Sequence, residues 1–411
     1  MSWQSFGRLF CGCLVSLLFS SGVSSANPKA VWQNWFVTQI EQHPDVIAAK
    51  ERMNSAFSTA ENLEQPLYNP QLETEYEREE ANNNYRIGIN QTVDWWDKRA
   101  VREQQAVFNR AAAKQAFQVA KQQKVTQALE AIAEWQGASQ RAKLALEQEA
   151  QLGTLLDLVQ RRQRSGDLGQ VDAELTFLGL SQRLNETAQA QAQLNQANAQ
   201  LQEIFPDWSP KWSQIPDSFW SGVQMVQTDQ WVDQHPAVLA ARGEWEILQQ
   251  SAELARRETK ADPTFGINAG QSTEGDVAAL TFSIPLNVRN NFSATARAAS
   301  QQALSAEARY RAVRRKQQAN IEATYLALQA YQRQYNRWKS LMKGRGERSE
   351  SLLEKQWGGG DLSTTEYLLA LQQRAEGLLA GIELSTRFQL ARIEWLFQSG
   401  QVNAALKQSP K

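Results

Sequence analysis

The sequence has few of the side chains that enzymes and metal sites use. Among its 411 residues there are two cysteines and two histidines. Cys11 and Cys13 both lie before Asn27, and the rest of the chain has no thiol. Disulfides, thiolate metal sites and cysteine nucleophiles are therefore excluded beyond that segment. Since there is also no glycine-rich phosphate loop and no HExxH pair, we expect no enzyme, no cofactor and no metal site.

Net charge and long apolar runs are missing as well. The chain carries 43 basic and 44 acidic residues, a formal charge of −1, so it has no bulk attraction for nucleic acid. Its mean hydropathy is −0.54. No segment after Ala26 approaches the ~18 uncharged apolar residues of a spanning helix. These values exclude a helical membrane protein.

The segment 1–26 is typical of a secretory signal peptide. Arg8 precedes an apolar run over Leu9–Phe19, and Ser24-Ser25-Ala26 supplies small residues for cleavage. The run is too short for a membrane span, although an uncleaved anchor is the alternative. An exported chain without spanning helices belongs in the periplasm, in the medium or in the outer membrane.

Proline is absent from two long stretches, residues 71–205 and 286–409. Because proline costs ~3 kcal/mol inside a helix, its absence permits very long helices. Both stretches are rich in Ala, Gln, Lys, Glu and Arg. We predict helices from Asp97 to about Arg164 and from about Asn290 to Gln356, each roughly 100 Å long at about 1.5 Å per residue.

What the chain does contain is a tandem duplication. The segment His43–Lys50 returns as His235–Arg242, a shift in numbering of 235 − 43 = 192. The turn Gly166-Asp167-Leu168 returns as Gly360-Asp361-Leu362, a shift of 360 − 166 = 194. This period is far longer than that of a solenoid repeat, so we expect approximate internal symmetry.

Each half is predicted to contain a long helical hairpin. Glycine is typical just past a helix end and aspartate can cap the next helix, so the turns fall at residues 165–169 and 358–362. The second helices run near Gln170–Ile204 and Ser363–Phe397. His43 and His235 precede proline at equivalent helix starts, which favours a structural role for both over a catalytic or metal-binding one.

Between its short and long helices, each half changes to a period of two, which is typical of β-hairpins. The alternating runs and polar turns are residues 72–77, 81–84 and 85–93 in the first copy, and 265–269, 272–276 and 280–286 in the second. Strands of about 10 residues cross a bilayer when tilted. Tyr85, Trp95 and Trp96 fit aromatic belts at its surfaces. A solvated surface hairpin is the alternative.

Residues 206–234 join the two halves. They interleave three prolines with Trp208, Trp212, Trp220 and Trp231. With four tryptophans, the segment is predicted to be an irregular packed girdle around the helices and not a flexible linker.

Four strands cannot close a barrel, and an open sheet edge in lipid leaves backbone groups unpaired at several kcal/mol each. Other copies must therefore complete the sheet. A dimer gives eight strands and a barrel filled by side chains, whereas a trimer gives twelve strands and an open lumen. If the apolar residues of the first strand face lipid, Glu73, Glu75 and Glu77 face that lumen.

Together, the duplicated His-Pro helix starts, the paired β-hairpins, the Gly-Asp-Leu turns and the period resemble the TolC-like outer membrane factors, over essentially the whole mature chain. Gln91–Arg99 and Ile284–Asn290 look most like the CzcC-like branch, the heavy-metal cation efflux proteins. The resemblance implies a mainly α fold with transmembrane β. A homotrimer forms a 12-stranded outer-membrane β-barrel that is continuous with an α-helical barrel in the periplasm.

The resemblance also implies a role. The trimer is expected to be the passive duct of a tripartite efflux system, docked to a periplasmic adaptor protein and an inner-membrane pump, commonly of the RND type. The expected cargo is heavy-metal cations, with drugs or type I protein secretion as alternatives. A structural coiled coil at the surface and a periplasmic adaptor are rivals. The first does not explain membrane-length hairpins, and the second has a single helical hairpin.

In this family the periplasmic helix tips carry the adaptor contact and the gate. The matching tip residues are Gly166, Asp167, Leu168 and Gly169 in the first half, and Gly360, Asp361, Leu362 and Ser363 in the second. Glu366 matches an acidic position that forms a carboxylate ring at the constriction, while Leu369 stands where the family often has a second acid. Asp172, the repeat-equivalent of Glu366, and Asp361 complete the candidate gate. Such a ring attracts cations; a solvated glutamate is the alternative.

The implied division of the chain has five parts: signal peptide 1–26; first repeat 27–205, with a β-hairpin at about 69–95 and a helical hairpin at about 97–205; equatorial linker 206–234; second repeat 235–400, with a β-hairpin at about 263–288 and a helical hairpin at about 290–398; and C-terminal tail 401–411.

Overall fold

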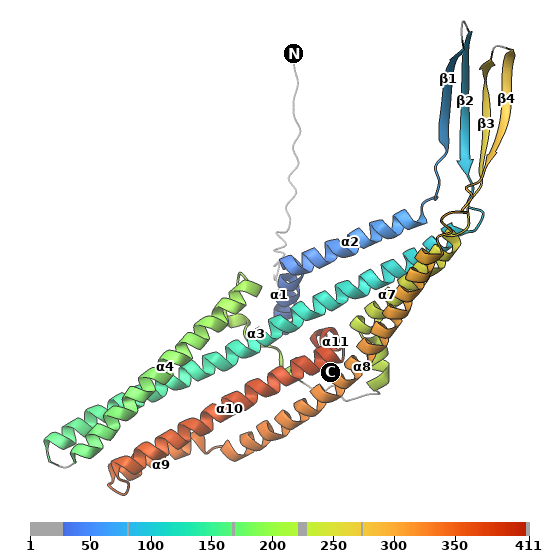
Figure 1. Cartoon of the computed structure of the whole chain (residues 1–411). Coiled ribbons are helices and arrows are strands. Elements are labelled where there is room, and N and C mark those ends of the chain that lie inside the picture. The colour runs from blue at the N-terminus through green and yellow to red at the C-terminus, as the bar shows by residue number, and fades with distance from the viewer. Residues whose placement is uncertain (1–27, 80–81, 167–168, 221–227, 273, 408–411) are drawn as a thin grey trace, which may run out of the picture.

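The computed structural model describes residues 28–407 except 80–81, 167–168, 221–227 and 273. The expected signal peptide lies outside the described residues. The molecule is long and narrow, with a four-stranded sheet at one end and the turns of two helical hairpins at the other (Figure 1). The predicted fold class, mainly helical with paired antiparallel hairpins, is confirmed.

The two β-hairpins share one sheet. Its strands, β1 (Gln71–Glu79), β2 (Asn82–Thr92), β3 (Thr264–Ser272) and β4 (Gly275–Ser283), pair antiparallel in the order β1-β2-β3-β4. Ile89 of β2 pairs with Ile267 of β3, so the central pairing joins the two halves of the chain. β2 and β4 begin earlier than predicted, at Asn82 and Gly275, because polar residues assigned to the turns extend the ladder.

The first helical hairpin matches its prediction. Helix α3 (Lys98–Arg164) has 67 residues, which is ~100 Å at 1.5 Å per residue. Helix α4 (Gln170–Ile204) has the predicted bounds and returns along the half of α3 that is far from the sheet (Figure 1). At the turn, Gly166 has a φ of 81°, a left-handed conformation that glycine adopts without strain.

In the second hairpin, the prediction of one helix over residues 290–356 is wrong. The chain forms α8 (Ser293–Met342) and α9 (Gly346–Gly358), and α10 (Thr364–Gln398) returns beside them. Between α8 and α9, Gly344 has a φ of 68°. A left-handed residue ends an α-helix, so Gly344 interrupts this one although no proline does.

Within the described residues, none of the helices combines the length and the apolar composition that crossing a membrane requires.

Shorter helices lie beside the long ones: α1 (Pro28–Gln42), α2 (Pro44–Glu64) and α7 (Pro236–Glu258). His43 and His235 precede α2 and α7. The Nδ1 atom of each accepts a hydrogen bond of 3.2 Å from the backbone N–H two residues on. Burial lowers the pKa of both imidazoles, which favours the neutral ring that this acceptor role needs. Both histidines cap their helices, which is a structural role, as predicted.

The segment between the halves packs against the middle of the long helices. It contains the short helices η1 (Pro210–Trp212), α5 (Asp217–Trp220) and α6 (Thr228–Gln234). Trp208, Trp212, Trp220 and Trp231 are partly buried against the main hydrophobic cluster. Near the C-terminus, α11 (Val402–Lys407) adds Val402 to the same cluster. The described part of this segment is therefore packed, as its tryptophans predict.

The elements lie side by side with two open edges. Near the sheet, α2 packs on α3, α3 on α7 and α7 on α8; near the tips, α4 packs on α3, α3 on α10 and α10 on α8 (Figure 1). One edge therefore consists of β1, α2 and α4, all from the first half of the chain. The other consists of β4 and α8, from the second half.

Candidate functional site: the sheet faces and the helix tips

The sheet has one polar and one apolar face. Alternation along β1 puts Glu73, Glu75 and Glu77 on the same face, and all three are exposed. The opposite face exposes large apolar side chains, namely Leu72, Tyr76, Tyr85, Ile87, Ile89, Phe265, Ile267, Leu280 and Phe282. A contiguous exposed apolar surface of this kind marks contact with lipid or with another protein.

Two residues of β2 partner the glutamates on the polar face. Arg86 Nη1 lies 2.9 Å from Glu75 Oε2, and Asn90 Nδ2 donates to Glu73 Oε2 at 2.6 Å. Arg86 and Glu75 are both about half exposed, so their pairing is worth no more than ~1 kcal/mol. Arg86 nevertheless offsets one of the three carboxylate charges, which the alternation of β1 alone did not predict.

A repeated tripeptide flattens the polar face. Gly88-Ile89-Asn90 in β2 lies antiparallel to Gly266-Ile267-Asn268 in β3. Each asparagine lies over the opposite glycine: an added Cβ on Gly88 would stand 1.6 Å from Asn268 Oδ1, and one on Gly266 would stand 1.8 Å from Asn90 Oδ1. Glycine permits this close approach at both positions. The Asn90 and Asn268 side chains therefore lie flat against the polar face of the sheet and do not project from it.

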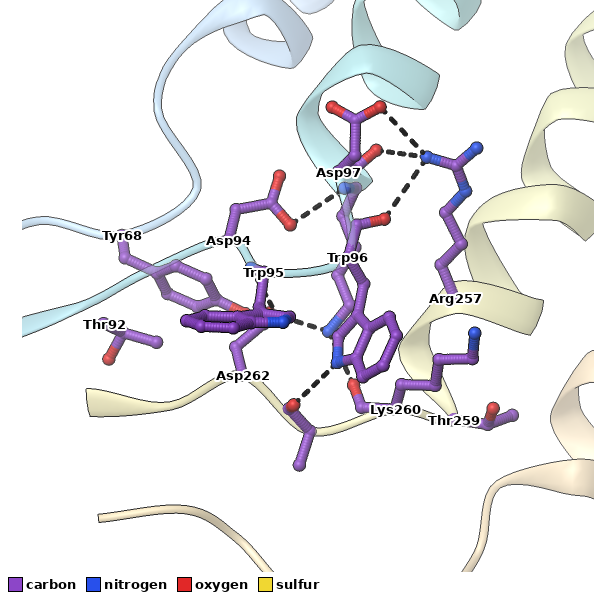
Figure 2. A network of polar contacts seen from close by, with 12 residues as sticks. Tyr68, Thr92, Asp94, Trp95, Trp96, Asp97, Arg257, Thr259, Lys260 and Asp262 are labelled. Carbon is purple, nitrogen blue, oxygen red and sulfur yellow. Dashed lines mark hydrogen bonds and ion pairs between the residues drawn. The ribbon is translucent and has the colours of Figure 1, made fainter. Parts of the chain in front are cut away.

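A buried ion pair joins the sheet to the helices. Lys98 Nζ, at the start of α3, lies 2.8 Å from Asp262 Oδ2, and their side chains are 7% and 2% exposed. Asp262 also accepts from the Tyr68 hydroxyl at 2.7 Å and from the Trp95 backbone N–H at 3.2 Å (Figure 2). Lys98 Nζ donates to the backbone oxygen of Lys260 at 2.9 Å. With these partners, the two buried charges hold the β2–α3 and α7–β3 connections together.

The same connection carries a strained residue. Asp97 has a φ of 57°, which is uncommon for a residue other than glycine. Arg257 Nη1 donates to the backbone oxygen of Asp97 at 2.5 Å (Figure 2). Trp96 Nε1 donates to the backbone oxygen of Ala261 at 2.9 Å, and Lys260 Nζ lies 4.3 Å from the Trp96 ring centroid. These contacts hold the strained turn; the aromatic belt stays a prediction.

At the tips, the prediction that aspartate caps the returning helix is wrong where it can be examined. Asp167 and Leu168 lie outside the described residues. Gly169 precedes α4 and has no side chain to cap it. In the second tip, Gly360 has a φ of 84°, and the N–H groups of Asp361 and Leu362 both donate to the Gln356 backbone oxygen, at 2.9 and 3.3 Å. The exposed Asp361 side chain does not cap α10; Ser363 does.

Glu366 and Ser363 cap α10 reciprocally. Glu366 Oε2 accepts from the Ser363 backbone N–H at 2.9 Å and from its hydroxyl at 2.8 Å, and Ser363 Oγ accepts from the Glu366 N–H at 3.2 Å. The backbone hydrogen bond from Ser363 lowers the pKa of Glu366. The carboxylate is exposed and stays charged at neutral pH. The Ser-x-x-Glu spacing is a capping box, a signal that the sequence carries beside the gate prediction.

Asp172 lies between the two hairpins. Its Oδ1 accepts a hydrogen bond from the Thr365 hydroxyl at 3.4 Å. Asp172 therefore lies next to the first turn of α10, which also contains Glu366. Asp361 is not part of this contact. Of the three predicted gate residues, two therefore lie at the place where α4 meets α10.

Sequence reasoning missed the aromatic cluster that holds the tips together. Trp357 of α9 stacks on Tyr367 of α10 at 5.0 Å between ring centroids, and Arg162 of α3 lies with its guanidinium carbon 5.1 Å from the Trp357 centroid. Leu152, Leu155, Val159 and Leu371 complete this tip cluster. Since α3 belongs to one hairpin and α9 and α10 to the other, the tip cluster joins the hairpins.

A groove runs beside the tip cluster between α3, α4 and α10. It has a volume of about 210 Å³, and Gln148, Leu175, Gly179, Arg183, Thr365 and Leu369 are among its lining residues. Leu369, at the second acidic position of the family pattern, is 55% exposed. Among the described residues, no group of three or more His, Cys, Asp or Glu side chains is placed to hold a metal ion.

No protein-family model matches the chain, and no curated protein matches it by sequence. Several solved structures match it closely in shape. The outer membrane protein VceC of Vibrio cholerae has a TM-score of 0.72 and 16% identity over 90% of this chain and 96% of its own. The CmeC outer membrane channel of Campylobacter jejuni has a TM-score of 0.73 and 11% identity over 97% and 94%.

The MtrE outer membrane channel of Neisseria gonorrhoeae, in its open state, has a TM-score of 0.72 and 13% identity over 90% of this chain and 89% of its own. The three structures come from different organisms and share little sequence with this chain. Over about nine tenths of its length, the chain has the fold of these outer membrane proteins.

Proposed function

We propose that three copies of the chain form a passive duct that runs from the periplasm through the outer membrane. The observation that carries the proposal is the sheet: its outer strands β1 and β4 are unpaired on one side, and its two faces differ in polarity. In lipid, an unpaired strand edge costs several kcal/mol per group. Closing the sheet with further copies removes both edges, with the apolar face toward lipid and the glutamate face toward water.

The helices support the same assembly. The edge of β1 continues into α2 and α4, and the edge of β4 continues into α8. One head-to-tail rotation therefore brings strand edge to strand edge and helix edge to helix edge at once. Three copies give twelve strands, enough for an open lumen. The solved outer membrane channels with this fold are consistent with such a duct.

For the partners and cargo, we propose that the helix tips dock a periplasmic adaptor, which connects the duct to an inner-membrane pump of the RND type. Heavy-metal cations are the proposed cargo. The acidic wall of Glu73, Glu75 and Glu77 and the exposed carboxylate of Glu366 suit cations better than anions. The tip residues Gly166–Gly169 and Gly360–Ser363 are the proposed adaptor contact.

The duct is tested by location and conductance. The protein is expected in outer-membrane fractions as a heat-modifiable trimer, and to form cation-preferring pores in planar bilayers. A soluble monomeric rod would contradict the proposal.

The cargo is tested separately: loss of the chain should sensitise cells to Co²⁺, Zn²⁺ or Cd²⁺ more than to detergents and dyes. The reverse pattern would leave the duct standing and overturn the metal cargo.

A further inference from the structure

We propose that the contact between neighbouring copies repeats the α3–α7 contact inside the chain, with α8 of one copy packed on α2 of the next, Ser300 opposite Thr59 and Leu304 opposite Ser55. This inference rests on the proposed assembly and specifies its register. The exposed faces of α8 and α2 would then be covered by a second copy of the same chain and by no other protein.

The duplication gives the equivalence of α3 and α8. Each begins directly after a residue other than glycine with a left-handed backbone, Asp97 at φ 57° and Phe292 at φ 54°. The shift in numbering between these two positions is 292 − 97 = 195. The buried Gln122 of α3 then corresponds to the buried Gln317 of α8. The two helices therefore turn corresponding faces toward the protein interior.

The equivalence of α2 and α7 follows from their caps. His43 and His235 cap the two helices in the same way, and their numbers differ by 235 − 43 = 192. α2 packs on α3 as α7 packs on α8. The remaining contact of this kind is α3 with α7, which joins the two halves. The corresponding contact, α8 with α2, cannot form within one chain, because the two helices lie at opposite edges.

The contact inside the chain fixes the register. Gln105 Nε2 of α3 donates to Ser251 Oγ of α7 at 2.9 Å. Applying the two shifts, 105 + 195 = 300 and 251 − 192 = 59, converts this pair into Ser300 and Thr59. One helical turn on, the same shifts give Leu304 and Ser55. All four side chains are exposed in the single chain, Leu304 by 58%.

The two contacts differ in chemistry. Inside the chain, α3 and α7 approach closely: an added Cβ on Gly243 would stand 2.8 Å from Ala112 Cβ. The same shifts place Glu51 and Glu307 at this point between copies, with Arg311 ion-paired to Glu307. Two carboxylates would then share one guanidinium where small residues touch inside the chain. The contact between copies is therefore wider at this point, where Arg311 stands beside the two carboxylates.

The connection to the sheet differs in the same sense. Asp262-Pro263 of the second half corresponds to Asn69-Pro70 of the first, and Lys98 corresponds to Ser293. The buried Lys98–Asp262 ion pair therefore has no charged counterpart between copies. Around the ring, the contact within each chain therefore has a buried ion pair next to the sheet, and the contact between chains has none.

Cysteine pairs test the register, because the chain after Ala26 has no thiol of its own. Thr59→Cys with Ser300→Cys brings two thiols within reach of a short, reducible bis-methanethiosulfonate cross-linker only if the proposal holds. After reaction with the linker in membranes, most of this variant should migrate as covalent dimers and trimers that reductant converts to monomer. Ser55→Cys with Leu304→Cys tests the same register one turn away, should the first pair disturb folding.

Two controls bracket the result. Thr59→Cys with Gln302→Cys places the second thiol on another face of α8 and should form no covalent oligomer. Gln105→Cys with Ser251→Cys should close within one chain and migrate as a monomer. Non-covalent trimers without cross-links in either test pair would overturn the register and leave the duct standing. A wild-type protein that forms no trimer would overturn the duct as well.

Discussion

Lys98 Nζ lies 2.8 Å from Asp262 Oδ2, at the point where the sheet meets the helices, although the two residues are far apart in sequence. Both side chains are almost fully buried, and their remaining polar atoms have partners in Tyr68, Trp95 and Lys260. The pair therefore holds the β2–α3 and α7–β3 connections in place, and its loss should lower the free energy of unfolding.

Asp262→Asn should destabilise the protein by about 3 kcal/mol, because it keeps the shape of the side chain but leaves the Lys98 charge buried without a counter-charge. Urea unfolding at fixed protein concentration measures this loss. Lys98→Met with Asp262→Asn should recover most of it, since no buried charge remains and the asparagine keeps an acceptor oxygen for Tyr68 and Trp95. As a control, Arg99→Gln breaks the exposed Arg99–Glu103 pair and should cost less than ~0.5 kcal/mol.

Trp357→Ala should loosen the helix tips while the rest of the molecule stays folded. The ring contacts Tyr367 and Arg162 from the two hairpins, and truncating a buried tryptophan costs ~3–5 kcal/mol. Faster amide exchange should appear in α9 and in the first turns of α10. Leu352→Ala, on the same helix but 53% exposed, is the control. Equal protection of the tips in both variants would contradict a role for the tip cluster.

Glu130 predicts a pH dependence of stability. Burial, followed by the charges of Glu394 and Glu134, raises the pKa of this carboxyl group to about 7 from 4.5. Between pH 4.5 and about 7, the folded protein therefore holds a proton on Glu130 that the unfolded chain has released. The contribution of this proton to stability is complete below pH 4.5 and is lost as the pH rises to about 7. Glu130→Gln should raise the free energy of unfolding at pH 8 by ~1–2 kcal/mol and change it little at pH 5.

The control for this measurement is Glu147→Gln, an exposed carboxylate on the same helix. It should leave the pH profile of the thermal midpoint unchanged. If Glu130→Gln left the same profile unchanged between pH 5 and 8, the raised pKa would be wrong.

Gly88→Ala should impair the sheet, since its Cβ would stand 1.6 Å from Asn268 Oδ1. The asparagine must leave its place over the glycine or the strands must separate. Gly88→Ala with Asn268→Ala removes the colliding atoms and should restore the amount of heat-modifiable trimer. Ala269→Gly, on the opposite face of β3, is the control for the loss of a side chain. Failure of the double variant to recover would show that Asn268 is not what Gly88 accommodates.

Glu366→Gln separates the two roles of this residue. Glutamine keeps the capping box with Ser363 and removes only the charge, so the helix should remain intact by circular dichroism. If Glu366 contributes to the gate, single-channel measurements should show weaker cation preference and weaker block by divalent ions. Glu366→Ala, which loses charge and cap together, should also lower stability by ~1 kcal/mol. Unchanged channel properties in the glutamine variant would leave Glu366 as a helix cap alone.

Local signals predicted the parts of the fold that depend on local structure. α4 has the expected bounds because a glycine precedes it and Phe205-Pro206 ends it. Alternation gave the faces of β1 correctly, since side-chain direction follows from the pleat. The interruption after α8 was missed, although Gly344 and Gly346 stand within an otherwise helical stretch and carry the signal.

The contacts that join distant segments could not be predicted in this way. Lys98 and Asp262 look like ordinary charged residues at the ends of helix and strand, and only the fold brings them together. Arg162 reaches Trp357 across two hairpins for the same reason. Within the sheet, Gly88 opposite Asn268 depends on the register of β2 and β3, which periodicity leaves open.

The two unlike edges make the chain directional. One border ends in β1 and α4 and the other in β4 and α8, so identical borders cannot pair as they do in a two-fold dimer. A subunit with substitutions that disrupt one edge alone still binds a partner through its intact edge. It then prevents the ring from closing. When such a subunit is co-expressed with the wild-type chain, it is expected to enter trimers and leave them open. The defect should therefore be dominant.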